Sequence, residues 1–157
     1  MIVFSFLMEG ASGRQEYLSY KPKHPLFYYG PIIGSTIAGG MVGYNIGQDQ
    51  LGMKHPGVAG VIGSLNGLNA GMLAGEYLDR KQRENEGKPY EGPRTMSDAG
   101  NEFLIKTGIG NVAALPIAAS GIGSFAPALI SAKFGHHLAP LINDRLSHPE
   151  VYNRKKK

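Results

Sequence analysis

The sequence predicts an all-α protein: an antiparallel, glycine-faced helical hairpin embedded in a membrane, followed by a proline-broken apolar helical segment. Three observations predict this class. The 157 residues include 23 glycines, about twice the average share, and these glycines lie among aliphatic residues. Two uncharged runs, 30–47 and 57–75, are long enough as helices to cross much of a bilayer. Each run contains a series of glycines that recurs at every fourth residue.

The chain divides into five predicted segments. A polar N-terminal arm (1–25) precedes the glycine-faced helical hairpin (26–78). A charged helix extension and linker (79–102) leads to the proline-broken apolar segment, which ends in a short amphipathic helix (103–146). A basic tail (147–157) follows. The second and fourth segments carry the long apolar runs, and the apolar residues 1–8 are either a short arm that touches the membrane or precede a true start at Met8.

The flanks of the hairpin carry residues that membrane interfaces favour. Pro22 and Pro25 disfavour helix in the residues that precede them, and Pro31 suits the first turn of a helix. Tyrosine and basic residues just outside an apolar run are typical of a bilayer surface. The predicted interface anchors are Tyr28, Tyr29, Tyr77, Lys21, Lys23, Arg80 and Lys81.

The glycine spacing predicts how the two runs pack. The packing positions are Gly39, Gly43 and Gly47 in the first run and Gly63, Gly67, Gly71 and Gly75 in the second, with Gly30 and Gly34 earlier on the same spacing. Residues four apart share a helix face, so each helix presents a nearly bare groove. In water each interior glycine costs ~0.5–1 kcal/mol relative to alanine, whereas helix association in lipid depends on close backbone approach at small residues. Three polar side chains are predicted to need partners inside the bundle: Asn45, Asn66 and Asn69.

Through these two glycine series the sequence resembles the glycine-zipper class of two-helix membrane segments over residues 30–78. A run of four glycines at this spacing is more specific than a single GxxxG pair. Such segments occur in envelope proteins, in pore-forming or injected virion proteins, and in organellar membrane complexes. The resemblance therefore implies a packing mode and leaves the biological role open.

The charged segment after the hairpin is predicted to extend the second helix into water. The helix continues from Glu76 to Glu86 until Gly87 stops it, and the rest of the segment is a linker. Ser97 is the predicted N-cap of the next helix. In this extension acidic residues alternate with basic ones: Asp79, Glu84 and Glu86 with Arg80, Lys81 and Arg83. Such alternation is typical of a solvated helix face.

A third apolar stretch covers residues 103–134, in which only Lys106 and Lys133 are charged. It is too long for one straight span, and Pro116 and Pro127 interrupt it. The stretch therefore predicts either a re-entrant pair of half-helices or a kinked single span.

The basic residues predict a topology. Lys and Arg flank the N-terminal side of the first run and the C-terminal side of the second, while the turn between the runs carries only Lys54. The positive-inside rule then places both ends of the hairpin in the cytoplasm or on an equivalent side. The basic tail, Arg154 to Lys157, is expected on that side as well.

The sequence contains no motif that predicts catalysis. It has no cysteine, which excludes thiolate chemistry and disulfides. The string from Gly47 to Lys54 departs from a phosphate-binding loop in its spacing and lacks the hydroxyl. The string from Gly108 to Ala113 matches GxGxxA without a preceding strand or a later acidic residue. His136 and His137 point to different helix faces and have no further ligands nearby. We therefore expect no catalytic residue, metal, cofactor or small-molecule substrate.

These observations predict a non-enzymatic structural or assembly subunit of a membrane complex. Its expected partners are the lipid bilayer and either further copies of itself or other membrane subunits. One alternative is a pore or translocation component, such as a small virion protein inserted into a host membrane, with the three asparagines lining a channel. A second alternative is a soluble helical scaffold whose basic ends contact nucleic acid.

Overall fold

The computed structural model describes residues 20–119, with the backbone alone for residue 110 and for 112–119. The regular secondary structure of this part is helical, which confirms the all-α prediction. Its elements are α2 (Pro25–Asn45), the π-helix η1 (Ile46–Gln50), α3 (Pro56–Asn85) and α4 (Met96–Ala119).

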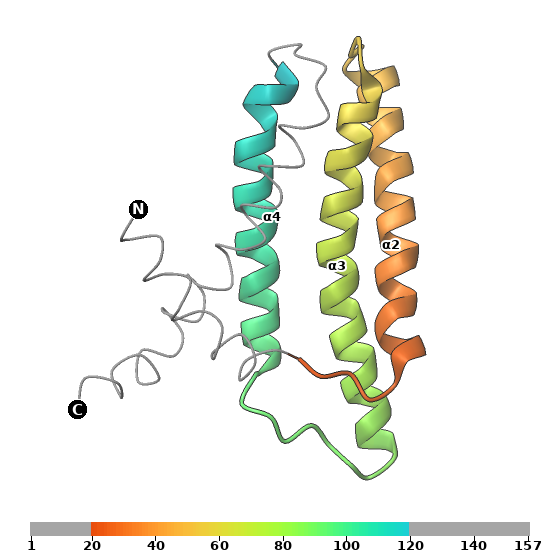
Figure 1. The fold of residues 1–157 in the computed structure, drawn as a ribbon, viewed down its shortest axis with the longest axis vertical. Coiled ribbons are helices and arrows are strands. Elements are labelled where there is room, and N and C mark those ends of the chain that lie inside the picture. The colour runs from red at the N-terminus through yellow and green to blue at the C-terminus, as the bar shows by residue number, and fades with distance from the viewer. Residues whose placement is uncertain (1–19, 120–157) are drawn as a thin grey trace, which may run out of the picture.

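The three long helices lie side by side with α3 in the middle (Figure 1). The chain reverses between α2 and α3 through η1 and a short turn, and it reverses again between α3 and α4. In the described part of the chain α2 and α4 do not pack against each other. The helix α3 therefore carries two separate interfaces, one with α2 and one with α4.

Prolines begin both helices of the hairpin. Pro25 and Pro56 lie in the first turn, where the missing N–H removes no helical hydrogen bond. Because α2 begins at Pro25, Pro31 lies inside the helix and not in its first turn as predicted. The hydroxyls of Ser35 and Thr36 each donate to the carbonyl oxygen four residues earlier, at 2.6 Å. Both hydroxyls thus find an acceptor within their own helix and need no water.

Backbone caps fix the end of α3. Gly87 has a φ of +68°, a left-handed conformation that side chains disfavour. The backbone N–H of Lys88 donates to Arg83 at 2.9 Å, and that of Gly87 donates to Glu84 at 3.0 Å. This pair of bonds is a Schellman motif, which satisfies the last carbonyls of the helix.

A capping box begins α4, two residues earlier in the chain than a cap at Ser97 would allow. The Thr95 hydroxyl accepts from the backbone N–H of Asp98 at 3.1 Å, and the Asp98 carboxylate accepts from the N–H of Thr95 at 2.8 Å. The cap is therefore Thr95, and the prediction of Ser97 is wrong. The helix passes through Pro116 to Ala119, so the predicted break at this proline is wrong too. The predictions for 1–19, for Pro127, for 138–146 and for the tail 147–157 lie outside the described residues.

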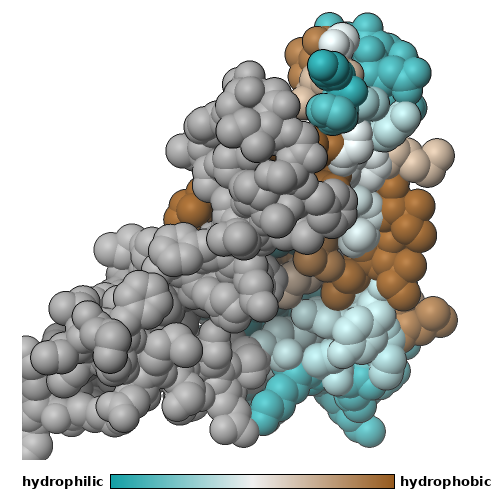
Figure 2. Space-filling view, turned by 45° about the horizontal axis from the view of Figure 1, so that its top comes forward, coloured by the Kyte–Doolittle hydropathy of each residue, from teal (hydrophilic) through white to brown (hydrophobic). Residues whose placement is uncertain are grey.

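The described residues bury charge and expose apolar side chains. Buried polar residues are Glu76, Asp79, Asp98, Glu102 and Lys106, whereas the buried hydrophobic ones are Val58 and Ala99. Five large apolar side chains of α2 are more than half exposed: Leu26, Ile33, Ile37, Met41 and Val42. On the face in view, Figure 2 shows hydrophobic surface over the middle of the hairpin and hydrophilic surface at both ends. This distribution is the reverse of the one that water imposes on a folded domain.

Candidate functional site

The interface between α2 and α3 brings backbone against backbone. It contains the seven predicted packing glycines, which we call the glycine seam: Gly39, Gly43, Gly47, Gly63, Gly67, Gly71 and Gly75. A Cβ at Gly63 would lie less than 3.0 Å from the carbonyl oxygen of Gly39 and 3.0 Å from the Cα of Gly43. Real Cβ atoms do not come so close to backbone, so any side chain here would push the helices apart.

The contacts in the middle of the glycine seam are reciprocal. The carbonyl oxygen of Gly63 fills the place that a Cβ of Gly39 would take, and the carbonyl oxygen of Gly39 does the same for Gly63. Gly43 has this relation to the carbonyl oxygen of Ala59. The Cα hydrogens of these glycines therefore point at carbonyl oxygens of the opposite helix. Such Cα–H···O contacts stabilise packed helices by about 0.5–1 kcal/mol each.

Toward the start of α2 the glycines of α3 face larger residues. A Cβ at Gly67 would meet the Ser35 carbonyl, with its carbon at 2.7 Å, and a Cβ at Gly75 would meet the Tyr28 carbonyl, with its carbon at 3.0 Å. The Ser35 hydroxyl also lies 2.7 Å from the carbonyl oxygen of Gly67, across the seam. In this half of the glycine seam, only α3 contributes glycines to the interface.

Gly30 and Gly34 lie outside the glycine seam. A Cβ at either position would meet nothing within 4 Å. The step from Gly34 to Gly39 is five residues long, so the earlier pair falls on another face, and its assignment to the same stripe is wrong. The stripe continues instead through Ser35, four residues before Gly39, and a search for small residues rather than glycine alone would have found it.

The three predicted asparagines occupy different environments. The side-chain amide of Asn66 donates to Oδ1 of Asn111 at 3.1 Å, which joins α3 to α4. Asn69 is half-buried on α3. Asn45 is exposed at the end of α2, so the prediction that it lies inside the bundle is wrong. The partner residue Asn111 was missed because nothing in the sequence places α4 against α3 at that depth.

At the end of the bundle opposite the α2–α3 turn, charged residues form a cluster that we call the charged clamp. It joins α3, the connection that follows α3, and the start of α4. Its members are Glu76, Asp79, Arg80, Arg83, Arg94, Glu102 and Lys106. All of them lie outside the uncharged run 57–75.

One half of the charged clamp is a chain of alternating charges. Glu76, which is 3% exposed, accepts from Arg80 at 2.6 Å and from Arg94 at 2.9 Å. Arg94 continues to Glu102 at 2.6 Å, and Glu102 pairs with Lys106. Burial alone would raise the pKa of Glu102, but the charges of Lys106 and Arg94 hold it below its usual value. Each buried carboxylate thus has two cationic partners, which offsets the cost of removing it from water.

In the other half of the charged clamp, a carboxylate of α3 caps the N-terminal end of α2. Asp79 is 0% exposed and accepts from the backbone N–H groups of His24 at 2.6 Å and Lys23 at 3.2 Å. The hydroxyl of Tyr20 and Nε of Arg83, at 3.0 Å, donate to the same carboxylate. Burial alone would raise the pKa of Asp79, yet these donors and the Arg83 charge lower it. A negative charge at this position also complements the dipole of α2.

Two aromatic rings cover the charged clamp. The rings of Tyr20 and Tyr90 lie 5.1 Å apart, and the Arg80 guanidinium lies 4.2 Å from the centre of the Tyr90 ring. Burial and the hydrogen bond to Asp79 raise the pKa of Tyr20. The guanidinium therefore gains a cation–π contact in addition to its ion pairs.

The structure corrects the predicted solvated helix face. Asp79 and Arg83 belong to a buried cluster, whereas Lys81 and Glu84, with side chains 57% and 55% exposed, do face solvent. The sequence did contain one signal for the clamp: acid–base pairs four residues apart recur at 76/80, 79/83 and 102/106. The long-range partner Arg94 had no such signal.

The predicted interface anchors are divided between surface and interior. Tyr29 and Tyr77 are 49% and 53% exposed. The lysines at 21, 23 and 81 are exposed as well. Tyr28 is half-buried and packs with its backbone against the seam, and Arg80, 14% exposed, belongs to the charged clamp. Five of the seven anchors therefore lie on the surface.

Among the helices of residues 20–119, α3 is long and apolar enough, by length and composition, to cross a membrane. The same residues contain no group of three or more His, Cys, Asp or Glu that could hold a metal ion. No family model, curated protein or solved structure matches this chain.

Proposed function

We propose that this chain is a non-enzymatic structural or assembly subunit of a membrane complex, and that its hairpin packs in the bilayer through the glycine seam. The proposal is carried by one observation, the reversed distribution of polarity. The clamp buries its charges, while the outer face of α2 leaves Leu26, Ile33 and Met41 at least 61% exposed.

The exposed apolar side chains favour lipid as the surroundings of the hairpin. Burying one such side chain fully is worth about 1.5–3 kcal/mol relative to leaving it in water. With five of them exposed on one helix, a large amount of this stabilisation is not gained in water. A bilayer removes this cost without any protein partner. It also favours the glycine seam, because bare helices associate in lipid by close packing and not by hydrophobic burial.

The length of the uncharged run in α3 agrees with a bilayer, and among residues 20–119 α3 is the one helix with the length and composition of a membrane span. The uncharged run 57–75 has a helical length of roughly 28 Å, against ~30 Å for the hydrocarbon core. The charged clamp begins at Glu76, directly after this run. It therefore lies where a spanning helix would reach the head groups. The exposed residues Tyr29 and Tyr77 are near neighbours in sequence of Tyr28 and Gly75, which meet across the two helices at this level.

We propose the clamp end as the cytoplasmic or equivalent side. Among the described residues, the clamp end carries every Lys and Arg of the polar regions except Lys54, which lies in the turn. The positive-inside rule depends on this count of basic residues and not on net charge.

Fractionation of cells that produce the full chain tests the proposal. We expect the protein to remain in the membrane pellet after extraction with alkaline carbonate and with high salt. Release by either treatment would contradict the proposal and leave a soluble helical scaffold.

Dye release from liposomes separates the assembly subunit from the pore. We expect vesicles that contain the purified chain to retain a small fluorescent dye as well as protein-free vesicles do. Rapid release at low protein-to-lipid ratio would favour the pore or translocation component instead.

A further inference from the structure

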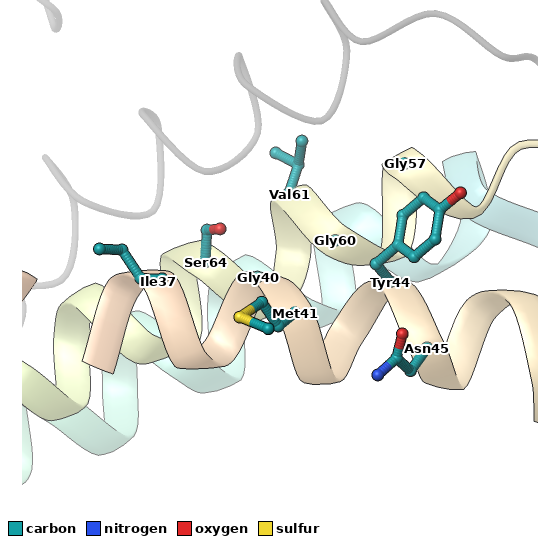
Figure 3. Close-up of a pocket in the computed structure, with 9 residues that line it drawn as sticks. All are labelled: Ile37, Gly40, Met41, Tyr44, Asn45, Gly57, Gly60, Val61 and Ser64. Atoms are coloured by element: carbon teal, nitrogen blue, oxygen red, sulfur yellow. The ribbon is translucent and has the colours of Figure 1, made fainter. Parts of the chain in front are cut away.

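An apolar groove lies along the outer side of the hairpin, in the half near the turn. It has a volume of about 560 Å³ and lies between α2 and α3 (Figure 3). Its floor is made of small residues, among them Gly40 and Gly60, and larger side chains from both helices stand beside it. These side chains are Ile37, Met41 and Tyr44 from α2 and Val61 from α3.

The lining of the groove suits a helix better than a small polar ligand. A small-molecule site usually combines an apolar pocket with a few convergent polar groups, and this groove is open and has only Ser64, Asn45 and the Tyr44 hydroxyl as polar side-chain groups. A floor without side chains between aliphatic walls is the form that receives bulky residues from an amphipathic helix. Ile37 and Met41, 59% and 64% exposed, have no such partner among residues 20–119.

The course of α4 brings the rest of the chain to this end of the bundle. α4 runs from the clamp end back to the turn end, where the described part of the chain closes at Ala119 (Figure 1). The next fifteen residues, 120–134, are apolar except for serines and Lys133. Ile122, Phe125 and Leu129 have the i, i+3, i+7 spacing of one helix face.

We propose that residues 120–134 of the same chain return across the bilayer and pack Ile122, Phe125 and Leu129 into this groove. The inference rests on the proposed membrane function, because the positive-inside rule requires the basic tail at the clamp end, whereas α4 brings the chain to the turn end at Ala119. As a helix this segment would extend roughly 22 Å, with Pro127 placing a kink between Phe125 and Leu129. That length covers the groove and brings Lys133 and the tail behind it toward the charged clamp.

Cysteine crosslinking in membranes tests the proposal, because the chain contains no cysteine of its own. Met41→Cys is combined in turn with Ile122→Cys, Phe125→Cys and Leu129→Cys in the full chain, and the membranes are oxidised. We expect at least one pair to convert most of the protein to an intramolecular disulfide, seen as a faster-migrating monomer on a non-reducing gel. The control pairs Phe125→Cys with Leu26→Cys, which is 80% exposed at the clamp end, and should leave the protein reduced.

A matched pair of valine substitutions shows whether the groove itself receives the segment. Val61 lines the groove, whereas Val42, 57% exposed on α2, does not. In the reactive cysteine pair, Val61→Trp should abolish most of the disulfide because the indole fills the groove. Val42→Trp should leave it unchanged.

Three outcomes would overturn the proposal. Disulfides that form only between chains would place a second copy in the groove. Absence of any disulfide, while a membrane-permeant maleimide still modifies the cysteine at position 41, would leave the groove to lipid. Equal loss of the disulfide in both valine variants would show that the groove is not involved. Carbonate extraction of the same membranes reports separately on the proposed membrane function.

Discussion

The two interfaces of α3 hold their partners by opposite means. The glycine seam joins α3 to α2 through the absence of side chains on its glycines, and its contacts are short, neutral and made mostly by backbone, with the Ser35 hydroxyl crossing it. The charged clamp joins α3 to α4 and to the start of α2 through long side chains whose charges alternate. The seam therefore has almost no tolerance for added volume, and the clamp has almost none for a lost charge.

This difference follows from the surroundings that each region would have in a bilayer. In hydrocarbon, no water competes for backbone groups and no hydrophobic force pushes helices together, so close packing decides association. At the head-group level, water and dipoles lower the cost of a charge, and a buried ion cluster can be formed there with full pairing. Each interface has the chemistry that its proposed depth permits.

The largest effect is expected in the charged clamp. Glu76→Ala removes the carboxylate that Arg80 and Arg94 share and leaves two buried guanidinium groups without it. We expect the free energy of unfolding, measured by denaturant titration in detergent micelles, to fall by about 3–5 kcal/mol. The control is Glu84→Ala, whose exposed pair with Lys81 is worth at most about 1 kcal/mol. Similar losses in both variants would mean that the clamp is no stronger than a surface ion pair.

The next effect is expected in the glycine seam. Gly67→Ala adds one Cβ where the Ser35 carbonyl already lies, and we expect a loss of about 1–3 kcal/mol by the same titration. Gly34→Ala is the matched control on α2, because its Cβ would meet nothing within 4 Å. That change should stabilise the helix by about 0.5–1 kcal/mol. A seam that tolerated alanine as well as position 34 does would not be closely packed.

A glycine outside the helices, such as Gly92 in the connection after α3, is an obvious choice of control for substitutions in the seam, but it is a poor one. A Cβ at this position would collide with the ring and hydroxyl of Tyr90. Because the Tyr90 ring packs against the tilted ring of Tyr20 and against the Arg80 guanidinium, a change there would disturb the charged clamp as well.

Acid should weaken the clamp while leaving the seam unaffected. The pKa values of Asp79 and Glu102 are lower in the folded chain than their ordinary values of 3.8 and 4.5. The stability that these carboxylates contribute is therefore fully present above the ordinary values and is lost as the pH falls through the lower folded ones. Unfolding free energies measured between pH 7 and pH 3 should stay level and then decline in the acid range. A decline centred near pH 6 would point to another group.

The smallest effect is expected from the polar bond between α3 and α4. Asn66→Ala breaks the hydrogen bond to Asn111, and polar bonds between helices in lipid are worth about 0.6 kcal/mol on average. Asn101→Ala, at an exposed position of α4, is the control and should change little. Thermal unfolding in the same detergent would detect the difference, and a larger loss for Asn101→Ala would contradict the assignment.

The sequence predicted the seam better than the clamp, and the reason is the range of the interactions. Gly63, Gly67, Gly71 and Gly75 follow one local period, so their common face could be derived without knowing any partner. Arg94 reaches Glu76 across 18 positions of chain, through a connection whose course no local period encodes. The same alternation of charges fits a solvated helix and a buried cluster equally well.

The carboxylate of Asp79 has a consequence for the order in which the chain can acquire its structure. It binds the backbone N–H of His24, 55 positions earlier in the sequence. A ribosome that has just delivered α2 has not yet made the residue that completes the first turn of this helix. Until the chain has emerged as far as Asp79, the first turn of α2 lacks the carboxylate that caps it in the final structure.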